Sequence, residues 1–431
     1  MIISFHLPVP VASFGGIALA LAVATSPASA VKCGDVITNN AVLNADLTCT
    51  CAWKSPASEP AAAALEVVGP ATLDLKGHTV SCGDKFGNEA AFDNDDFHLM
   101  ACLTISGKGA TVKNGIFTEC MAGIAGNELG VEDVLIKDII ATNIGYYGIA
   151  VVGNNNRLHN VTIDNYLDVG IYLEGNNNEV KESNVTNGLH GIDLKGNDNH
   201  VKSSYVARTD YAGIEFIGNN NNARSNTVEN GNVFSCMITN GVGNVVKNNT
   251  VRRCSGFGVN SKGNNSIITG NTFYSTAKAS IYATLPRFFN GTGHRITGNR
   301  IEKSGADGIV IARGQEKTVV ARNVIVDSVG NGILLATWSA RSRVLSNTVS
   351  KCGKVGLWIK GADGNNVTDN EISSCTKGIV AGLGSNRNRL INNRASNNAL
   401  FDLNEMSANC GSNIWKGNTG KGNIACTQQE K

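Results

Sequence analysis

A repeat of about 23 residues is the feature that most constrains this chain. Thirteen copies are each marked by an apolar residue that usually follows a glycine, and the steps between markers run from 21 to 28 residues. The markers are Ile124, Ile149, Ile171, Ile192, Ile214, Met237, Val259, Ile281, Ile309, Ile333, Leu357, Ile379 and Phe401. Self-similarity at such a period is typical of solenoids, in which each repeat buries its apolar side against its neighbours.

Within each repeat the apolar residues alternate with polar ones. Ile192 and Leu194 point to one side of the segment, and Asp193 and Lys195 to the other. This period of two predicts strands with the aliphatic side inward. The interval between strands is too short for a helix, so parallel strands must be joined by winding. The sequence therefore predicts an all-β, single-stranded parallel β-helix of about a dozen coils, each of about 22–24 residues.

Asparagine is the commonest residue at the expected corners of the coils. Asn tolerates the left-handed backbone of tight turns, and stacked Asn amides can hydrogen-bond along the axis as a ladder. One ladder is predicted from Asn154, Asn176, Asn197, Asn219 and Asn264. A second is predicted from Asn160, Asn226, Asn271, Asn299, Asn323, Asn347 and Asn370.

The two ends of the chain differ from the middle. An apolar run, Gly15 to Ala24, precedes an Ala-Ser-Ala cleavage pattern, which predicts a signal peptide over residues 1–30 and a secreted protein. Residues 31–122 are predicted to form an N-terminal cap and irregular first coils with an acidic insertion, and 57–66 a short capping helix. Regular repeats are expected over 123–409, followed by a disulfide-closed tail over 410–431.

The chain has 12 cysteines, which with an export signal predicts disulfides. Pairing of nearest neighbours gives Cys33–Cys49, Cys51–Cys82, Cys102–Cys120, Cys236–Cys254, Cys352–Cys375 and Cys410–Cys426. Cys352 and Cys375 occupy nearly the same corner of adjacent coils, which makes that bridge geometrically easy. Asn160, Asn184, Asn248, Asn264, Asn290 and Asn366 begin sequons, so a glycoprotein is one expectation; chance placement of Thr after corner Asn is the other.

Charge and hydropathy limit the partners. The net charge is +2 without a run of Lys or Arg, which argues against nucleic acid. No segment after the signal is long and apolar enough to span a membrane. No CxxC pair is present and the 7 His are scattered, so no metal site is expected. The acidic insertion offers Asp93, Asp95 and Asp96 as possible calcium ligands, against the alternative of a solvated loop.

The repeats resemble the right-handed parallel β-helix repeat of the pectate-lyase-like superfamily, including its carbohydrate-binding and sugar-hydrolase type repeats. The opening CGDVITNNAVLNADLTC, followed by ATLDLKGHTV, is similar to the start of secreted members. The resemblance covers nearly all of residues 33–426. It implies a fold shared by lyases, hydrolases and epimerases of acidic polysaccharides and by noncatalytic proteins. The Asp-Pro-His-Asp motif of mannuronan epimerases and the polygalacturonase motifs are absent. NosD-like metal-delivery proteins are further relatives, but no Met or His cluster supports that role.

The residue after each marker is predicted to face outward and to stack along one face. In order, these residues are Ala125, Ala150, Tyr172, Asp193, Glu215, Ile238, Asn260, Tyr282, Val310, Leu334, Trp358 and Val380. Tyr172, Asp193 and Glu215 lie on consecutive coils, about 5 Å apart. Two carboxylates that close raise the pKa of one of them, which suits an acid–base pair on a glycosidic bond.

Candidate site residues follow from this face. The candidate catalytic residues are Asp193, Glu215, Tyr172 and His190. The candidate substrate-binding residues are Lys195, Arg208, Tyr147 and Tyr211, because cations bind acidic sugars and aromatic rings can line a groove; Asp168 and Asp210 are further candidates for its rim. The alternative is that outward positions on a solvated strand are simply polar.

The second half of the outer face is apolar, with IVIA, ILLA, LWIK and IVAG in successive coils. An apolar patch of this size is expected to be covered. The candidates for the cover are the tail around Trp415, the long turn containing Leu285 and Phe289, or a second subunit that contacts Val310, Leu334 and Trp358.

Two functions remain open at this point. The first is a carbohydrate-active enzyme of lyase, hydrolase or epimerase type for an acidic polysaccharide. The second is a noncatalytic extracellular or cell-wall protein that binds as a stiff rod. Ice binding needs a regular Thr ladder, which the outer face lacks. No cofactor is required by either, apart from the possible calcium.

Overall fold

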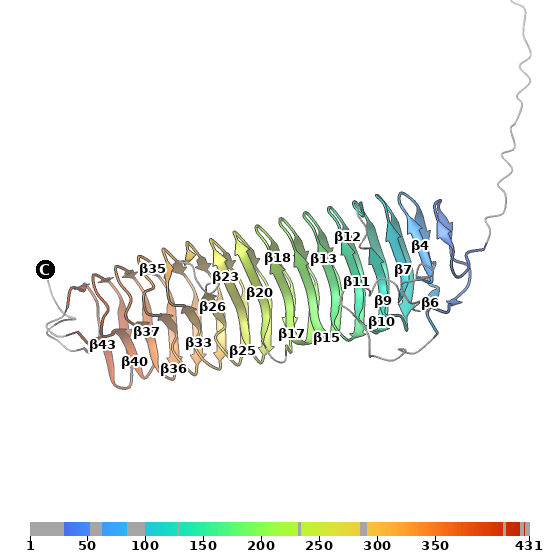
Figure 1. Cartoon of the computed structure of the whole chain (residues 1–431). Helices are drawn as coiled ribbons and strands as arrows, with labels where there is room; N and C mark the ends of the chain where they lie inside the picture. The colour runs from blue at the N-terminus through green and yellow to red at the C-terminus, as the bar shows by residue number, and fades with distance from the viewer. Residues whose placement is uncertain are drawn as a thin grey trace, which may run out of the picture.

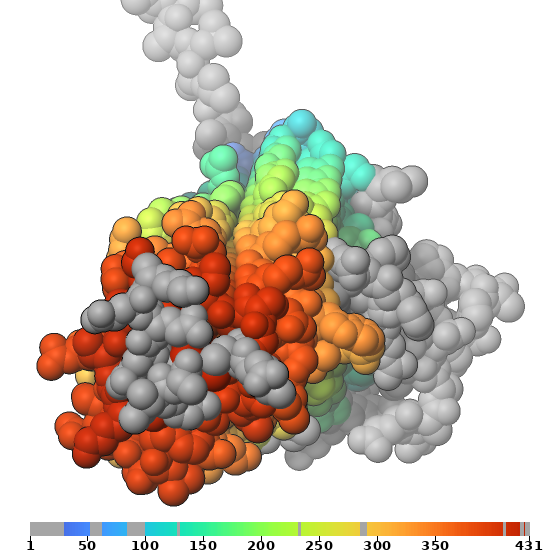
Figure 2. Space-filling model, turned by 90° about the vertical axis from the view of Figure 1, so that its left-hand side faces the viewer, coloured from blue at the N-terminus to red at the C-terminus, as the bar shows by residue number. Residues whose placement is uncertain are grey.

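The strands stack side by side along a single rod (Figure 1). The computed structural model describes residues 30–51, 63–83, 100–126, 130–231, 234–284, 291–407, 411–422 and 426. All pairings between its strands are parallel, and most join a residue to one that lies 21 to 28 positions further along the chain. Figure 2 looks along the rod from its C-terminal end, where the colours pass in order from red to blue. The predicted parallel β-helix is therefore confirmed.

The strands form three parallel ladders, here called A, B and C. Ladder A contains β1 (Val36–Ile37), β4 (Leu65–Val68), β7 (Ala101–Ser106), β9 (Ala122–Gly126), β11 (Tyr147–Val152), β13 (Val169–Glu174), β20 (Ser235–Val242), β23 (Phe257–Asn264), β26 (Ile281–Thr284), β30 (Ile309–Ile311), β34 (Ile333–Leu335), β37 (Val355–Ile359), β40 (Lys377–Ala381) and β43 (Phe401–Glu405). Two long strands, β15 (Asn184–Lys195) and β17 (Tyr205–Ile217), continue from ladder C into ladder A.

Ladders B and C complete each coil. Ladder B contains β2 (Ala41–Val42), β5 (Thr72–Asp74), β14 (Glu179–Lys181), β16 (His200–Lys202), β18 (Asn222–Arg224), β21 (Val245–Lys247), β24 (Ile267–Thr269), β28 (Arg295–Thr297), β32 (Val319–Ala321), β35 (Arg343–Leu345), β38 (Asn366–Thr368), β41 (Arg389–Ile391) and β44 (Ile414–Lys416). Ladder C contains β3 (Leu47–Thr48), β6 (Thr79–Ser81), β19 (Thr227–Glu229), β22 (Thr250–Cys254), β25 (Thr272–Thr276), β29 (Arg300–Ser304), β33 (Val324–Ser328), β36 (Thr348–Cys352), β39 (Glu371–Ser373) and β42 (Arg394–Ser396). β8 (Thr111–Thr118), β10 (Leu135–Ile144) and β12 (Arg157–Tyr166) run from B into C, and β27 (Gly291–Thr292) pairs separately with β31 (Gln315–Glu316).

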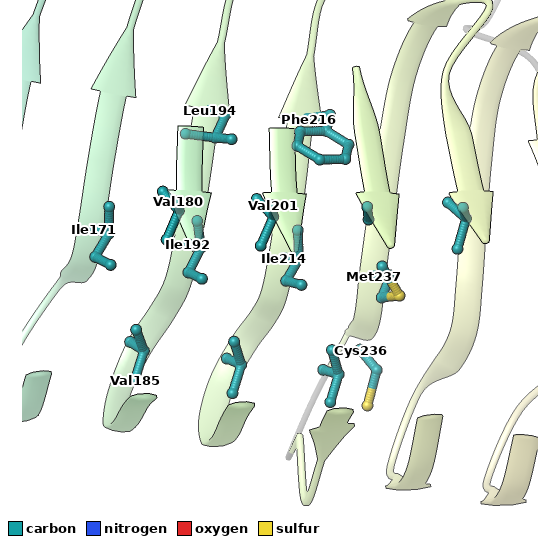
Figure 3. Close-up of a cluster of buried hydrophobic side chains, with 14 of the residues drawn as sticks. Ile171, Val180, Val185, Ile192, Leu194, Val201, Ile214, Phe216, Cys236 and Met237 are labelled. Atoms are coloured by element: carbon teal, nitrogen blue, oxygen red, sulfur yellow. The ribbon is translucent and has the colours of Figure 1, made fainter. Parts of the chain in front are cut away.

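The markers of the repeat form one inward column of ladder A. Ile171, Ile192 and Ile214 are direct partners in the register, and all three are fully buried. Figure 3 shows them with residues of the other ladders, such as Val180 and Val185, inside the coil. The prediction of Phe401 as the marker of the last coil was wrong. Ile379 pairs with Leu403 rather than with Phe401, because the last coil lacks the glycine that fixes the register elsewhere.

The predicted helix over 57–66 was wrong where it can be compared with the structure. Leu65 and Glu66 belong to strand β4, which pairs with β1 and β7. Leu65 and Val67 are buried and Glu66 and Val68 are only partly buried, as in a strand with one side toward the core, so ladder A begins before the regular repeats. Nearly all of the predicted signal peptide, most of the expected capping helix and most of the acidic insertion lie outside the described residues.

Asparagine ladders run along the rod, with some changes from the expected members. The backbone N–H of Asn176, Asn197 and Asn219 donates to the amide oxygen of the preceding Asn in the column that starts at Asn154. Val242 interrupts this column before Asn264. The second ladder is continuous from Asn226 to Asn418 and includes Asn249 and Asn393, which were not predicted.

Asn160 is not a member of the second ladder. Its amide donates to Asp138, and the ladder position of that coil is Val161, followed by Ser183 and Ser204. A third, buried ladder joins Asn156, Asn178, Asn199, Asn221 and Asn244. The ladders give buried backbone N–H groups partners at the corners, which is a requirement of any buried polar group.

Five of the six predicted disulfides are present. They are Cys33–Cys49, Cys51–Cys82, Cys102–Cys120, Cys236–Cys254 and Cys352–Cys375, with Cα separations from 4.3 to 5.8 Å. Cys410 lies outside the described residues, so its pairing stays a prediction. Disulfides of this number are typical of proteins outside the cytoplasm. The helices of the described residues include none long and apolar enough to cross a membrane.

Candidate functional site

The outer column of ladder A has the predicted register along its whole length. Tyr172 pairs with Asp193, and Asp193 pairs with Glu215. Strands in register lie about 4.8 Å apart, so these three side chains leave the rod one above the other. The carboxylates are partly buried, with 14% of the Asp193 and 15% of the Glu215 side chain exposed. Three consecutive coils therefore carry a compact polar window, defined by Tyr172, Asp193 and Glu215.

His190 joins the two carboxylates of the window. Its Nδ1 lies 3.1 Å from Oδ2 of Asp193 and 3.9 Å from Oε2 of Glu215. Gly191 follows it at a close approach of two coils, where a Cβ would lie 2.3 Å from the carbonyl oxygen of Gly213. The imidazole meets Asp193 three residues further along the same strand and Glu215 on the neighbouring coil.

Burial shifts the pKa values of ionisable groups in and beside the window. It raises the pKa of Glu215 to about 7, with the charge of Asp193 adding to the effect. The same burial works against a charged His190, but contact with Asp193 and the charges of Glu215 and Asp168 raise its pKa overall. Burial also raises the pKa of Asp168. At neutral pH the cluster therefore holds one carboxyl group that can give up a proton and one imidazole that is readily charged.

Tyr147 borders the window on the N-terminal side, and Lys195 lies beside the window residue Tyr172. The Tyr147 and Tyr172 rings have centroids 5.9 Å apart, and the Nζ of Lys195 lies 4.8 Å from the Tyr172 centroid. The hydroxyl of Tyr172 donates to Glu174. Asp168 interacts with the hydroxyls of Tyr146 and Tyr147. The predicted candidates Tyr147, Tyr172 and Lys195 are thus brought together by the fold.

Tyr211 borders the window on the other side. Its ring centroid lies 4.6 Å from that of His190 and 5.2 Å from that of Phe234, to which it is nearly parallel. Phe234 and Lys262 were not among the predicted site residues, although the Nζ of Lys262 lies 5.4 Å from the Phe234 centroid. The register was the available signal, since Lys262 stands in the column that contains Lys195.

Arg208 and Asp210 lie apart from the carboxylate pair. Arg208 has a left-handed backbone at the corner between ladders C and A, and its Nε donates to Oδ1 of Asn187 at 2.5 Å. Both residues line an open hollow of about 660 Å³ together with Tyr166 and Leu189. Arg208 therefore belongs to a neighbouring concavity rather than to the window.

The window also has the donor atoms of a metal site, which the sequence analysis did not expect. His190, Asp193 and Glu215 each offer one atom, and these atoms lie within 4.8 Å of one another. One nitrogen with two carboxylate oxygens suits a transition-metal ion better than calcium, which prefers oxygen alone. The expected calcium ligands Asp93, Asp95 and Asp96 lie outside the described residues.

Comparison with known families agrees with this architecture. Residues 147–286 and 190–349 match the model of a right-handed β-helix region. The chain is a parallel β-helix repeat protein. Residues 287–428 of this β-helix protein also match the model described as periplasmic copper-binding protein (NosD). That segment contains a single His, the fully buried His294, and a single Met, Met406. None of the curated proteins matches the chain.

Several solved structures are similar to this chain at low sequence identity. Tailspike protein 3 of bacteriophage CBA120 is 10% identical, with a TM-score of 0.45, and the match covers 88% of this chain and 55% of the tailspike. The β-helix protein thus spans about half of the tailspike's length. A PL6 alginate lyase in complex with a trisaccharide is 11% identical, with a TM-score of 0.40 and coverage of 73% and 80%. The mannuronan C-5 epimerase A-module of Azotobacter vinelandii is 13% identical, with a TM-score of 0.36 and coverage of 82% and 90%.

Proposed function

We propose that this protein is a secreted enzyme that cleaves glycosidic bonds of an acidic polysaccharide at the window of Tyr172, Asp193 and Glu215. The observation that carries the proposal is the pairing of Asp193 with Glu215 and the pKa of about 7 of the Glu215 carboxyl group. An acid that is half protonated near neutral pH is well matched to a leaving-group oxygen. The disulfides support a location outside the cytoplasm.

The separation of the carboxylates favours hydrolysis with retained configuration. Retaining enzymes hold the two groups about 5–5.5 Å apart, and the donor atoms of Asp193 and Glu215 lie within 4.8 Å. Glu215 gives its proton to the leaving oxygen while Asp193 bonds to the anomeric carbon. Glu215 then takes a proton from water, which attacks that carbon and releases Asp193. No electron carrier is needed in either step.

The remaining residues hold the sugar and the acids. His190 lies 3.1 Å from the carboxylate of Asp193 and 3.9 Å from that of Glu215, where its charge can stabilise either carboxylate. The half-buried ring of Tyr147 offers a stacking surface for a sugar ring. Lys195 lies beside Tyr172, where its ammonium can pair with a uronate carboxylate. This last contact is the reason to propose an acidic rather than a neutral polysaccharide.

A second candidate is a metal-assisted lyase or epimerase for uronates. It is favoured by one observation, the convergence of His190, Asp193 and Glu215. A divalent cation held there would neutralise the substrate carboxylate, and Lys195 or Tyr172 would move the proton next to it. Calcium fits this donor set poorly.

A panel assay separates these functions. The mature protein is incubated with neutral and uronic polysaccharides, with added divalent metal or with chelator, beside an Asp193→Ala, Glu215→Ala double variant. New reducing ends without unsaturated ends, insensitive to chelator and absent in the variant, are expected. Unsaturated ends that disappear with chelator favour the lyase. No cleavage of any substrate contradicts the proposal and favours a noncatalytic binding rod.

A further inference from the structure

The outer face of ladder B carries a line of basic side chains that does not show as a run in the sequence. In each coil of this ladder a buried residue stands between two residues that face outward. The Lys and Arg residues at these outward positions are Lys113, Lys137, Arg157, Lys181, Lys202, Arg224, Lys247, Arg295, Arg343, Arg389 and Lys416. Among the described outward positions from β8 to β44, Glu179 is the single acid, although the net charge of the chain is only +2. The register therefore gathers positive charge on one face of the rod.

The two halves of this face differ in how the positive charge is balanced. In the N-terminal half the ion pairs are Lys113–Asp74, Lys181–Glu182 and Lys202–Glu179. From β18 onward no carboxylate of the described residues forms an ion pair with the outward cations Arg224, Lys247, Arg295, Arg343 and Arg389. On the same coils, Arg341 at the corner between ladders A and B does pair with Glu316. The C-terminal half of the face thus carries positive charge that no described acid neutralises.

Three arginines of this half line one hollow of about 210 Å³. Arg295 and Arg343 stand in one column with Val319 between them, so their Cα atoms lie two coil steps, roughly 10 Å, apart. Arg322 lies at the corner after β32, and all three arginines are exposed. Val319 and Ala321 also line the hollow. Guanidinium groups bind carboxylates, sulfates and phosphates through paired N–H donors, so the hollow has the chemistry of an oxyanion site.

The line of cations on either side of the hollow favours a polymer over a small ion. Arg389 stands in the same column two coils beyond Arg343. On the other side, Arg224 and Lys247 precede the hollow in the column that reaches Thr297, a further lining residue. A small ion would use the hollow alone, whereas a linear polysaccharide with carboxylates or sulfates at a regular repeat uses the whole line.

Nucleic acid suits this face less well. Proteins that bind single-stranded nucleic acids stack the bases on aromatic side chains. No Phe, Tyr or Trp occupies a described outward position of ladder B from β8 to β44. The charged groups of the polymer are therefore recognised here without any contact to a base.

We propose that the outer face of ladder B from β18 to β41 binds a linear anionic polysaccharide along the rod, with Arg295, Arg322 and Arg343 around one of its carboxylate or sulfate groups. This surface is separate from the window, which lies on the outer face of ladder A. The inference is independent of the proposed cleavage, because it concerns binding alone. It gives the protein a second place at which a polymer is held.

A binding measurement with charge-matched variants tests this surface. The parent is the Asp193→Asn, Glu215→Gln variant, so that no polymer is cleaved, and the probes are polygalacturonate, dextran sulfate and uncharged dextran. Arg295→Gln with Arg343→Gln in this parent should weaken binding of an anionic probe by roughly fivefold to thirtyfold and make the affinity less sensitive to salt. Binding of polygalacturonate identifies the groups held as carboxylates, and binding of dextran sulfate alone identifies them as sulfates.

The matched control removes the same charge from another part of the same coils. Lys303→Gln with Lys351→Gln alters two exposed corners between ladders C and A and should keep the affinity of the parent. Both variant pairs should keep its melting temperature, because the four side chains are exposed. An equal loss of affinity in the two pairs, or no loss in the arginine pair, overturns the inference.

The choice of polymer is tested by the same assay. Absence of binding to both anionic polysaccharides overturns the inference, and so does binding of a DNA duplex or of anionic lipid vesicles in their place. Absence of cleavage by the wild type would overturn the proposed function and leave this result unchanged, since the affinities are measured without cleavage.

Discussion

The window and the apolar half of the outer face stand in the same column of ladder A but differ in every outward residue. Over β13, β15 and β17 the column holds Tyr172, Asp193 and Glu215. Over β30, β34, β37 and β40 it holds Val310, Leu334, Trp358 and Val380. The inward neighbours are apolar and buried in both regions. The inward residues therefore specify the coil, and the outward residues are free to specify what the coil does.

The apolar half is partly covered. Val310 is 7% and Val380 2% exposed, while Leu334 and Trp358 are half-buried. Trp415 was one predicted cover, and that prediction was wrong, because Trp415 pairs with Leu390 in ladder B and lies inside the core. The long turn at 285–290 lies outside the described residues. Self-association through this face stays a prediction.

The largest expected effect is the loss of cleavage when the window loses an acid. Asp193→Asn and Glu215→Gln should each lower kcat by about 10²- to 10⁴-fold, the usual contribution of a positioned acid or base. Glu371→Gln on the exposed part of β39 is the control and should keep full activity. An equal loss in all three variants would contradict a role for the window.

A charged residue introduced into the apolar half should lower the stability of the protein rather than abolish cleavage. Val310→Asp places a carboxylate at a buried site and is expected to lower the free energy of unfolding by about 2–5 kcal/mol. Leu334→Asp should cost less, because that side chain is only half-buried. Chemical denaturation gives both values, and size-exclusion chromatography shows whether a subunit contact is lost. Unchanged stability and unchanged size would mean that the face is not covered in solution.

The raised pKa of Glu215 predicts a pH dependence of stability. The folded state binds this proton more tightly, with a pKa of about 7 against the ordinary 4.5, so stability falls as pH rises through that range. Relative to Glu215→Gln, the wild type should lose roughly 3 kcal/mol between pH 4 and pH 8 at most. Parallel unfolding curves for both proteins, taken across that range, measure the difference. A constant difference would show that Glu215 has an ordinary pKa.

The smallest expected effects are on stability, and they should be equal under the window and under the apolar half. Asn199→Ala under the window and Asn365→Ala under the apolar half each remove an acceptor from a buried backbone N–H of the preceding coil. Each is expected to cost about 1–3 kcal/mol. Thermal and chemical denaturation of the two variants should agree closely. A large cost in only one region would mean that the coils are not equivalent scaffolds.

Most of the fold could be predicted from the repeat, because the spacing of its apolar residues follows from strand geometry. A strand shows one side to the core at every second residue, so the spacing from Ile171 to Ile192 and Ile214 fixes which residues face outward. The same register placed Cys352 beside Cys375, whereas the other pairs were predicted only as nearest neighbours. It failed where a coil lacks the pattern: the coil of Phe401 lacks the glycine before the marker, and Val161 holds the ladder position in the coil of Asn160.

Less of the candidate site than of the fold could be predicted from the sequence. Stacking of Tyr172, Asp193 and Glu215 followed from the period, but the approach of His190 depends on the backbone path at Gly191. The pKa of Glu215 depends on burial, and burial of an outward residue is not set by the period. Ala125 and Asp193 share one column, yet the first is covered and the second reaches solvent.

The most direct test measures cleavage and stability together in wild type, Asp193→Asn and Trp358→Ala. The account predicts that Asp193→Asn loses cleavage and keeps its melting temperature, whereas Trp358→Ala keeps cleavage and melts at a lower temperature. Cleavage then reports on the window, and the melting temperature reports on the apolar half of the same column. Retention of cleavage by Asp193→Asn, on a substrate that the wild type cleaves, would contradict the assignment of function to the window.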